Sequence, residues 1–161
     1  MEERTAEELM TSRSRMQVLN VTAQTREVLD HIAASPRSRY PVYQDNLDQM
    51  VGVLHVKDFI RARARGKSTD LSQLLRPLPS VAASATAEEL LSMFERRRVH
   101  AALVVYEFGG TLGFVTMDDL ISDVMREEDT TTSLWIHLNE DGSYLLDGEV
   151  TLSELKEDYD I

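Results

Sequence analysis

A nine-residue pattern occurs twice in this chain of 161 residues, and the two copies lie 61 positions apart. Residues 52–60 read GVLHVKDFI and residues 113–121 read GFVTMDDLI. Each copy has a glycine, two apolar residues, a polar residue, two further residues, an aspartate and two apolar residues. Self-similarity at such a spacing indicates a duplicated structural unit. The sequence therefore predicts a fold built from two related halves.

The repeat extends upstream of the nine-residue pattern. Residues 22–32 predict a helix with Thr22 as the N-cap and with Val28, Leu29 and Ile32 on one face. Residues 84–94 repeat that spacing, with apolar residues at 90, 91 and 94. A short apolar strand follows in each copy, at 40–43 and at 101–105. A turn and a second strand come next, and an aspartate then begins a helix, over 58–64 in the first copy and 119–125 in the second.

Each copy is thus predicted to run strand, helix, strand, strand, helix. A single copy offers one sheet with helices on one face and leaves the other face uncovered. Two copies that pack sheet to sheet remove this problem and create two symmetry-related clefts. We therefore expect an α+β fold of the α/β type, in which the two copies form a pseudo-two-fold pair.

The amino-acid composition limits the classes of function that this chain can have. The chain has no cysteine, so disulfides and thiolate chemistry are excluded. A net charge of −11 disfavours general nucleic-acid binding. Two basic clusters, residues 61–67 and 96–98, are either helix ends or a local phosphate site. The longest apolar stretches, such as 101–105, are too short to cross a bilayer, so we expect no direct membrane insertion by this chain.

Catalytic equipment is not evident in the sequence. No nucleophile lies beside a base in a recognisable motif, and no glycine-rich loop leads into a helix with a lysine. Asp58 and Asp119 belong to different copies, which argues against a carboxylate pair for acid–base catalysis. We expect binding without turnover, and therefore not an enzyme.

Three segments carry a family resemblance. They resemble the CBS-domain pair (Bateman module) of the CorC/HlyC magnesium and cobalt efflux proteins, which are relatives of the cyclin M transporters. The segments are residues 38–43, 51–58 and 98–119, and the last contains the run Glu107–Thr111. The resemblance implies CBS motif 1 at 7–65, CBS motif 2 at 71–127, and the start of a truncated C-terminal transporter-associated domain at 130–161. The chain departs from the family at Ser12, where proline is common, and at Tyr106, where an acid is common.

The resemblance implies a cytosolic regulatory module that binds an adenine nucleotide, ATP with magnesium or AMP. It would form a CBS homodimer and control the membrane transport domain of a full-length magnesium/cobalt efflux protein. It would then be cytoplasmic and tethered to the cytoplasmic face of the cell membrane. Two alternatives stay open: a ligand-free dimerisation or tethering module, and the regulatory CBS pair of another channel or enzyme.

The expected nucleotide site centres on Asp119 and Thr116. A carboxylate at a helix start can accept hydrogen bonds from both ribose hydroxyls, and Thr116 places a hydroxyl beside it for a phosphate or the ribose edge. The alternative role for Asp119 is an ordinary helix-capping carboxylate. The resemblance adds further residues from the first copy. Thr11 lies at the entry of the adenine end, and the strand start at Arg39, Tyr40 and Pro41 would supply backbone contacts and a ring or stem to pack on. Arg37 and Arg39 are assigned to the phosphates. Asp118 would face a magnesium ion carried by the nucleotide.

A second site is expected in the symmetry-related cleft, from His55, Asp58, Arg98 and His100. His55 stands where the first cleft has a threonine, is bulkier, and titrates near neutral pH. This cleft would be empty or less suited to nucleotide. The alternative is that His55 is a half-exposed strand residue.

Overall fold

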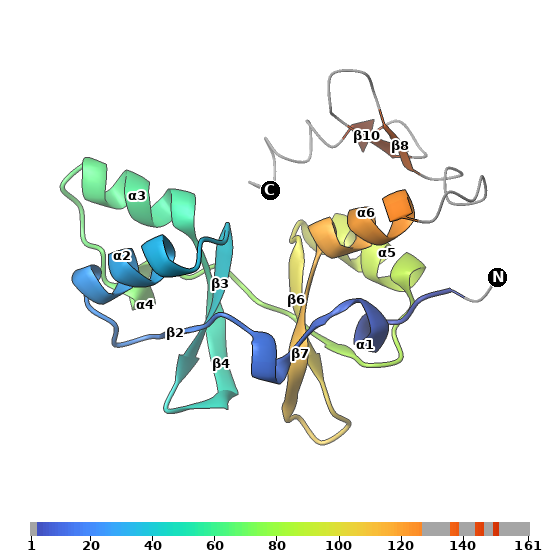
Figure 1. Cartoon of the computed structure of the whole chain (residues 1–161), viewed down its shortest axis with the longest axis horizontal. Helices are drawn as coiled ribbons and strands as arrows, with labels where there is room; N and C mark the ends of the chain where they lie inside the picture. The colour runs from blue at the N-terminus through green and yellow to red at the C-terminus, as the bar shows by residue number, and fades with distance from the viewer. Residues whose placement is uncertain (1–2, 127–135, 139–143, 147–149, 152–161) are drawn as a thin grey trace.

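The computed structural model describes residues 3–126, 136–138, 144–146 and 150–151. Two similar units lie side by side, with strands in the middle and helices on the outer flanks (Figure 1). The first unit consists of β2 (Leu19–Asn20), α2 (Thr25–Ala34), β3 (Arg39–Gln44), β4 (Asn46–His55) and α3 (Val56–Ala64). The second consists of β5 (Ser80–Ala82), α5 (Ala87–Arg97), β6 (Ala101–Val105), β7 (Thr111–Thr116) and α6 (Met117–Arg126). Both units confirm the predicted order of strand, helix, strand, strand, helix.

The two sheets have the same internal arrangement. The first has the order β2-β3-β4 and the second the order β1-β7-β6-β5. In each sheet the first strand of the unit pairs in parallel with the next, because the intervening helix carries the chain back across the sheet. The last two strands form an antiparallel hairpin in both units.

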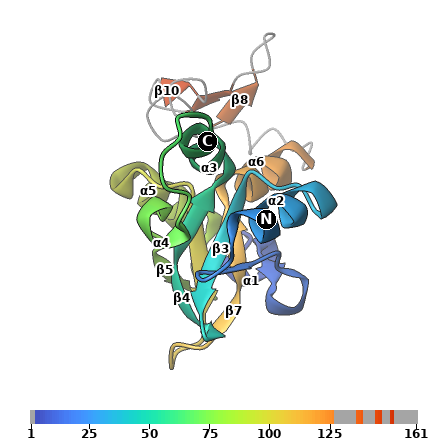
Figure 2. The ribbon, with the colours of Figure 1, turned by 90° about the vertical axis from the view of Figure 1, so that its left-hand side faces the viewer.

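Each unit has its own apolar core, and a third cluster joins them. The side chains of Phe59 and Phe94 are fully buried in the first and second cores. Val53, Ala101 and Phe114 come from the inner strands of both units and pack together. The cluster joins strands of the two units. The strands of both units lie together in the middle of the molecule (Figures 1 and 2), which confirms sheet-to-sheet packing.

The N-terminal segment crosses from one unit to the other. It forms α1 (Ala6–Leu9), β1 (Thr11–Ser12) and a 3₁₀ turn (Arg13–Arg15) before the first unit begins. Strand β1 pairs antiparallel with β7, and Ala6 and Leu9 are buried in the core of the second unit. Residues that precede the first unit in sequence therefore complete the sheet of the second.

The pseudo-two-fold includes these crossing segments. Thr11 pairs with Phe114, and Arg76 forms the corresponding bridge to Val53. The preceding glycines explain the close approach. A Cβ added at Gly113 would lie 2.5 Å from the carbonyl oxygen of Thr11, and one added at Gly52 would lie 2.9 Å from that of Arg76. Thr11 and Arg76 are therefore structural counterparts.

Some predicted helix starts are wrong. The N-cap of α2 is Gln24, because the amide and hydroxyl of Thr22 both donate to Asn20 Oδ1, at 3.0 and 2.9 Å, in the preceding turn. Asp58 and Asp119 are the third residues of α3 and α6 rather than the first. At the third position a carboxylate can fold back onto the residue that precedes the helix.

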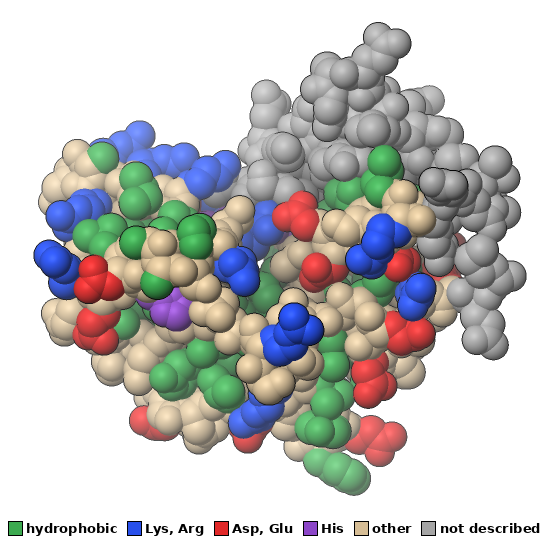
Figure 3. All heavy atoms as spheres, viewed as in Figure 1, with side chains coloured by type: hydrophobic (Ala, Val, Ile, Leu, Met, Phe, Trp, Pro, Cys, Tyr) green, Lys and Arg blue, Asp and Glu red, His purple; other side chains and the backbone are tan. Residues whose placement is uncertain are grey.

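The basic clusters lie where the helix-end interpretation placed them. Arg61 and Arg63 are in the last turn of α3, and Arg96 and Arg97 are in the last turn of α5. Lysine and arginine side chains gather over α3 on the view of Figure 3. Cations at these ends complement the partial negative charge of the helix carbonyls.

The remaining elements lie after each unit. Helix α4 (Leu71–Leu74) precedes β5, and β8 (Ile136–Leu138), β9 (Tyr144–Leu146) and β10 (Val150–Thr151) form a small antiparallel sheet. The rest of the predicted C-terminal domain start, 130–161, lies outside the described residues. Among the described residues, no helix has the length and apolar character needed to span a membrane.

Candidate functional site

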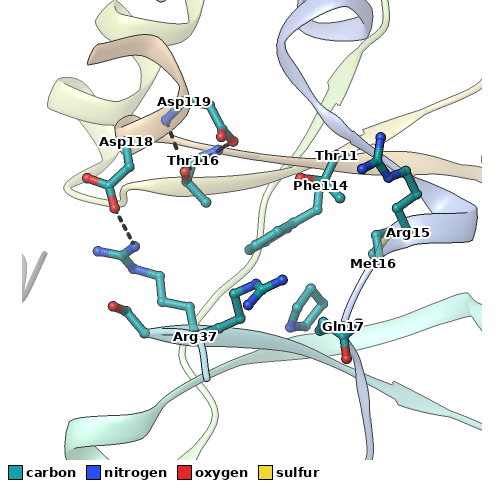
Figure 4. Close-up of a pocket in the computed structure, with 12 residues that line it drawn as sticks. Thr11, Arg15, Met16, Gln17, Arg37, Phe114, Thr116, Asp118 and Asp119 are labelled. Carbon is teal, nitrogen blue, oxygen red and sulfur yellow. Dashed lines mark hydrogen bonds and ion pairs between the residues drawn. The ribbon is translucent and has the colours of Figure 1, made fainter. Parts of the chain in front are cut away.

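A pocket of about 350 Å³ lies between the two units (Figure 4). Its walls come from the N-terminal segment, the start of β3, and the β7–α6 junction. The lining residues are Thr11, Arg15, Met16, Gln17, Arg37, Ser38, Arg39, Pro41, Phe114, Thr116, Asp118 and Asp119. Because no single unit supplies all the walls, the pocket exists only when the units are packed together.

Thr116 and Asp119 form a reciprocal cap at the start of α6. The Thr116 amide donates to Asp119 Oδ2 at 2.8 Å, and the Thr116 hydroxyl donates to the same oxygen at 3.1 Å. The Asp119 amide in turn donates to Thr116 Oγ1 at 3.2 Å. This arrangement is the helix-capping role considered as the alternative for Asp119. Both hydrogen bonds that the Asp119 carboxylate accepts from Thr116 end on Oδ2 and none ends on Oδ1, and Asp119 lines the pocket.

Burial raises the pKa of the Asp119 carboxyl above its ordinary value of 3.8. The hydrogen bonds from Thr116 lower the pKa and offset part of this effect, while the neighbouring charge of Asp118 raises it further. A partly desolvated carboxylate gains more from hydrogen-bond donors than a hydrated one does. Hydroxyl groups of a sugar would be such donors.

Three arginines from the first part of the chain also line the pocket. Arg15 comes from the N-terminal segment, and Arg37 and Arg39 flank the start of β3. The Arg39 side chain is only 4% exposed, and its Nη1 lies 3.6 Å from Asp118 Oδ2 on the other unit. The carboxylate of Asp118 is 62% exposed, so the ion pair lies at the rim of the pocket. The pocket thus combines cations from one half of the chain with carboxylates from the other.

Most of the residues expected at the first site line this pocket, but the Tyr40 ring does not. Tyr40 is fully buried in the core of the first unit, its ring meets His31 edge to face, and its hydroxyl donates to the Ser35 carbonyl at 2.5 Å. Successive side chains of a strand point to opposite faces, so Arg39 and Pro41 face the pocket and Tyr40 faces away. The expectation that its ring packs on a base is wrong.

Five lining residues were not predicted from the sequence: Arg15, Met16, Gln17, Ser38 and Phe114. The Phe114 ring projects between the acidic end of the pocket and the N-terminal segment (Figure 4). In sequence Phe114 reads as an ordinary core residue of a strand. Its position directly after Gly113, where β1 crosses, is the only signal that could have identified it.

The second expected site is built differently. The side chains of His55 and His100 pack edge to face with ring centroids 4.7 Å apart, and the two residues are 3% and 2% exposed. The interpretation of His55 as a half-exposed residue is therefore wrong. Asp58 receives two hydrogen bonds from Arg76, from Nε at 2.8 Å and from Nη2 at 3.0 Å.

Arg98, the fourth residue expected there, is an exposed residue in the left-handed conformation that caps the end of α5. The structure brings together His55 with His100, and Asp58 with Arg76, at this second cleft.

Comparison with known proteins adds independent findings. The family model described as CBS domain matches residues 6–65 and 70–126. The UPF0053 protein sll0260 of Synechocystis sp. is 35% identical over 162 residues, which cover 99% of this chain and 36% of that protein. Hemolysin C of Brachyspira hyodysenteriae is 33% identical over 150 residues, which cover 91% of this chain and 55% of that protein. The chain thus spans about a third to a half of the length of these relatives.

A solved structure supports the same relationship. The CBS domain of the bacterial CNNM/CorC family Mg²⁺ transporter in complex with ATP is 32% identical, with a TM-score of 0.68 over 76% of this chain and 87% of that one. Both the arrangement of the two halves and the sequence are therefore similar to those of a domain that has been solved with a nucleotide.

Proposed function

Because this chain belongs to the CBS-domain family, as a tandem CBS pair of the CorC/HlyC type, we propose that it is a regulatory module that binds an adenine nucleotide between its two motifs. The ligand is ATP with magnesium, and binding occurs without turnover. The module is cytoplasmic and controls a magnesium/cobalt efflux protein to which it is attached at the cytoplasmic face of the membrane.

The observation that carries this proposal is the inter-unit pocket. Its volume of about 350 Å³ lies in the range of small-molecule sites, about 300–1,000 Å³. Asp119 would accept from a ribose through Oδ1, and Phe114 and Met16 would offer apolar surface to a flat base. Arg37 and Arg39 supply planar donors that match phosphate oxygens. The solved relative in complex with ATP supports the choice of nucleotide.

Magnesium would arrive with the nucleotide. Among the described residues there is no cluster of three or more metal-ligating side chains, so the chain does not by itself build a site for a bare ion there. Magnesium commonly binds through one or two carboxylates together with phosphate oxygens. Asp118 is exposed at the pocket rim and fits the role of that carboxylate. Its ion pair with Arg39 would loosen as the phosphates attract the guanidinium.

Regulation would follow from the position of the ligand between the motifs. A nucleotide that contacts both halves favours the packed arrangement, and a CBS homodimer would transmit that preference to the attached transport domain. A ligand shifts such an equilibrium only by its difference in affinity for the two states. The partners proposed are thus a second copy of this chain and the membrane domain of the same full-length protein.

Thermal unfolding with and without Mg-ATP tests the proposal. Ligand at 100 times its dissociation constant should stabilise the chain by about 2.7 kcal/mol. Asp119→Ala should remove most of this shift. The matched control is Asp30→Ala on α2, whose carboxylate is 69% exposed and pairs only with Arg26 among the described residues.

The outcomes separate the alternatives. No shift with millimolar Mg-ATP or AMP would refute nucleotide sensing and favour the ligand-free tethering module. An equal shift in the Asp119→Ala and Asp30→Ala variants would place the ligand away from this pocket.

A further inference from the structure

The pseudo-two-fold gives each wall of the first pocket a counterpart in the second cleft. The amide of Val56 donates to the Ser38 carbonyl at 3.0 Å, and the amide of Met117 donates to the His100 carbonyl at 2.8 Å. Val56 and Met117 are the first residues of α3 and α6. Ser38 in the first pocket therefore corresponds to His100 in the second cleft.

The same symmetry relates the residues that precede the two helices. Thr116 corresponds to His55, since each is the last residue of its strand. In the first pocket Thr116 and Ser38 are small side chains that line an open space. In the second cleft, two imidazole rings in contact occupy the corresponding positions and are buried.

The carboxylates differ as well. Asp119 lines the first pocket and accepts the Thr116 hydrogen bonds on one oxygen only, whereas both oxygens of Asp58 accept from Arg76 in a bidentate pair. Arg76 is the counterpart of Thr11, as the crossings over Gly52 and Gly113 establish. The guanidinium therefore makes with Asp58 the paired hydrogen bonds that ribose hydroxyls would make with a free carboxylate.

Cations that would attract phosphates are also replaced in the second cleft. The register places Ala101 opposite Thr116 and Arg39 opposite His55, so Ala101 stands where the first pocket has Arg39. Ala101 is 3% exposed and carries no charge. The second cleft thus differs in its sugar-binding, wall and phosphate positions.

We infer that the second cleft is a nucleotide site occupied by the chain's own side chains, in which Arg76 is a built-in substitute for the ligand at Asp58 and the His55–His100 contact fills the space that Thr116 and Ser38 leave open in the first pocket. The inference rests on the proposed function of the first pocket. It predicts that each chain binds one nucleotide, and that three substitutions reopen the second cleft.

Calorimetric titration of the whole chain with Mg-ATP tests the first part. The native chain should bind one Mg-ATP per chain. Asp58→Ala should leave the dissociation constant and the stoichiometry unchanged, because Asp58 meets no ligand. Asp119→Ala, at the equivalent position of the other motif, should weaken binding about 10- to 100-fold, as expected for lost hydrogen bonds to a charged group.

A triple variant tests the second part. Arg76→Thr, His55→Thr and His100→Ser give the second cleft the side chains that the first pocket has at Thr11, Thr116 and Ser38. A second Mg-ATP should then bind, more weakly because Ala101 carries no charge, and adding Asp58→Ala to the triple variant should abolish it. Thermal unfolding of each variant without ligand reports whether it is folded.

The results discriminate between this inference and the proposed function. Two Mg-ATP per native chain, or a loss on Asp58→Ala equal to that on Asp119→Ala, would overturn the inference while supporting nucleotide binding. A folded triple variant that still binds one Mg-ATP would also overturn it. If the native chain does not bind Mg-ATP, the proposed function is refuted. Even then, Mg-ATP binding that the triple variant gains and that depends on Asp58 would support the self-occupied cleft. If the triple variant does not fold, the comparison of Asp58→Ala with Asp119→Ala decides.

Discussion

Gly113→Ala is the substitution that most directly tests how the N-terminal segment joins the second unit. The added Cβ would lie 2.5 Å from the Thr11 carbonyl oxygen and 2.5 Å from Met10 Sδ, far inside ordinary contact distances. The methionine side chain can turn away, but the carbonyl oxygen moves only if β1 moves. The new methyl group therefore has to push β1 away from β7.

The magnitude follows from two opposing effects. Alanine in a strand where it fits is favoured over glycine by about 0.5–1 kcal/mol. Overpacking of a closely packed site costs about 1–3 kcal/mol. Since the clash involves backbone, we expect the overpacking cost to dominate and the variant to lose about 1–2 kcal/mol. For a domain of this size, each kcal/mol lowers the melting temperature by about 2–4 °C.

Two other glycines serve as controls in urea unfolding. At Gly52 the nearest atoms are 2.9 Å away, the Arg76 oxygen and the Leu75 Cβ, so Gly52→Ala should cost less than Gly113→Ala. At Gly110 the nearest atom is 3.2 Å away on the exposed ring of Tyr106, which can turn, so Gly110→Ala should be nearly neutral.

Ligand binding adds a second measurement. Because Thr11 lines the inter-unit pocket, Gly113→Ala should also weaken the proposed Mg-ATP binding, whereas Gly110→Ala should not. A Gly113→Ala chain as stable as the native chain, or more stable, would refute the close crossing of β1 over β7.

Three further predictions concern acidity and the core. Burial raises the pKa of Asp119 in the folded chain, so the charged carboxylate lowers the folding stability above that raised pKa. Asp119→Asn should therefore stabilise the ligand-free chain at pH 7, and the gain should shrink as the pH falls toward 3.8. Urea unfolding at both pH values measures the difference. The hydrogen bonds from Arg13 and from the Thr111 amide lower the pKa of Asp48. These hydrogen bonds therefore stabilise the chain above pH 3.8, and the stabilisation is lost as the pH falls through the lowered pKa. Asp48→Asn should be less stable than the native chain at neutral pH and equally stable in strong acid. Phe94→Ala removes a fully buried ring and should cost about 3–5 kcal/mol of unfolding free energy in the same assay, and a loss below 1 kcal/mol would contradict the packing of the second core.

The repeat predicted the fold because both copies carry the same alternation of apolar residues and the same glycine and aspartate. These features depend on local periodicity, which a sequence displays directly. Crossing of the N-terminal segment was not predicted, since a two-residue strand such as β1 has no period to detect. Its single sequence trace is Gly113, and a glycine alone does not name the segment that lies against it.

The site was predicted in part for a similar reason. Asp119 and Thr116 lie three residues apart, so their contact follows from the start of one helix. Tyr40 was assigned to the wrong face, because the sequence RYP does not tell which of two alternating faces is the core. The pair of Asp58 with Arg76 joins residues on different elements, and neither has a local pattern that identifies the other.

The distribution of charge explains why a ligand in the first pocket would act on the whole pair. Arg37 and Arg39 belong to the first unit, and Asp118 and Asp119 belong to the second. In an adenine nucleotide the sugar joins the base to the phosphates, so a ligand that uses its sugar and its phosphates at once would contact both sets of groups, and its binding energy would depend on the distance between the units. In the second cleft the corresponding carboxylate is already neutralised by Arg76, so the packing there does not depend on a ligand. The His55–His100 contact joins the two units at the second cleft without a ligand, whereas at the first pocket a nucleotide would add contacts to both units.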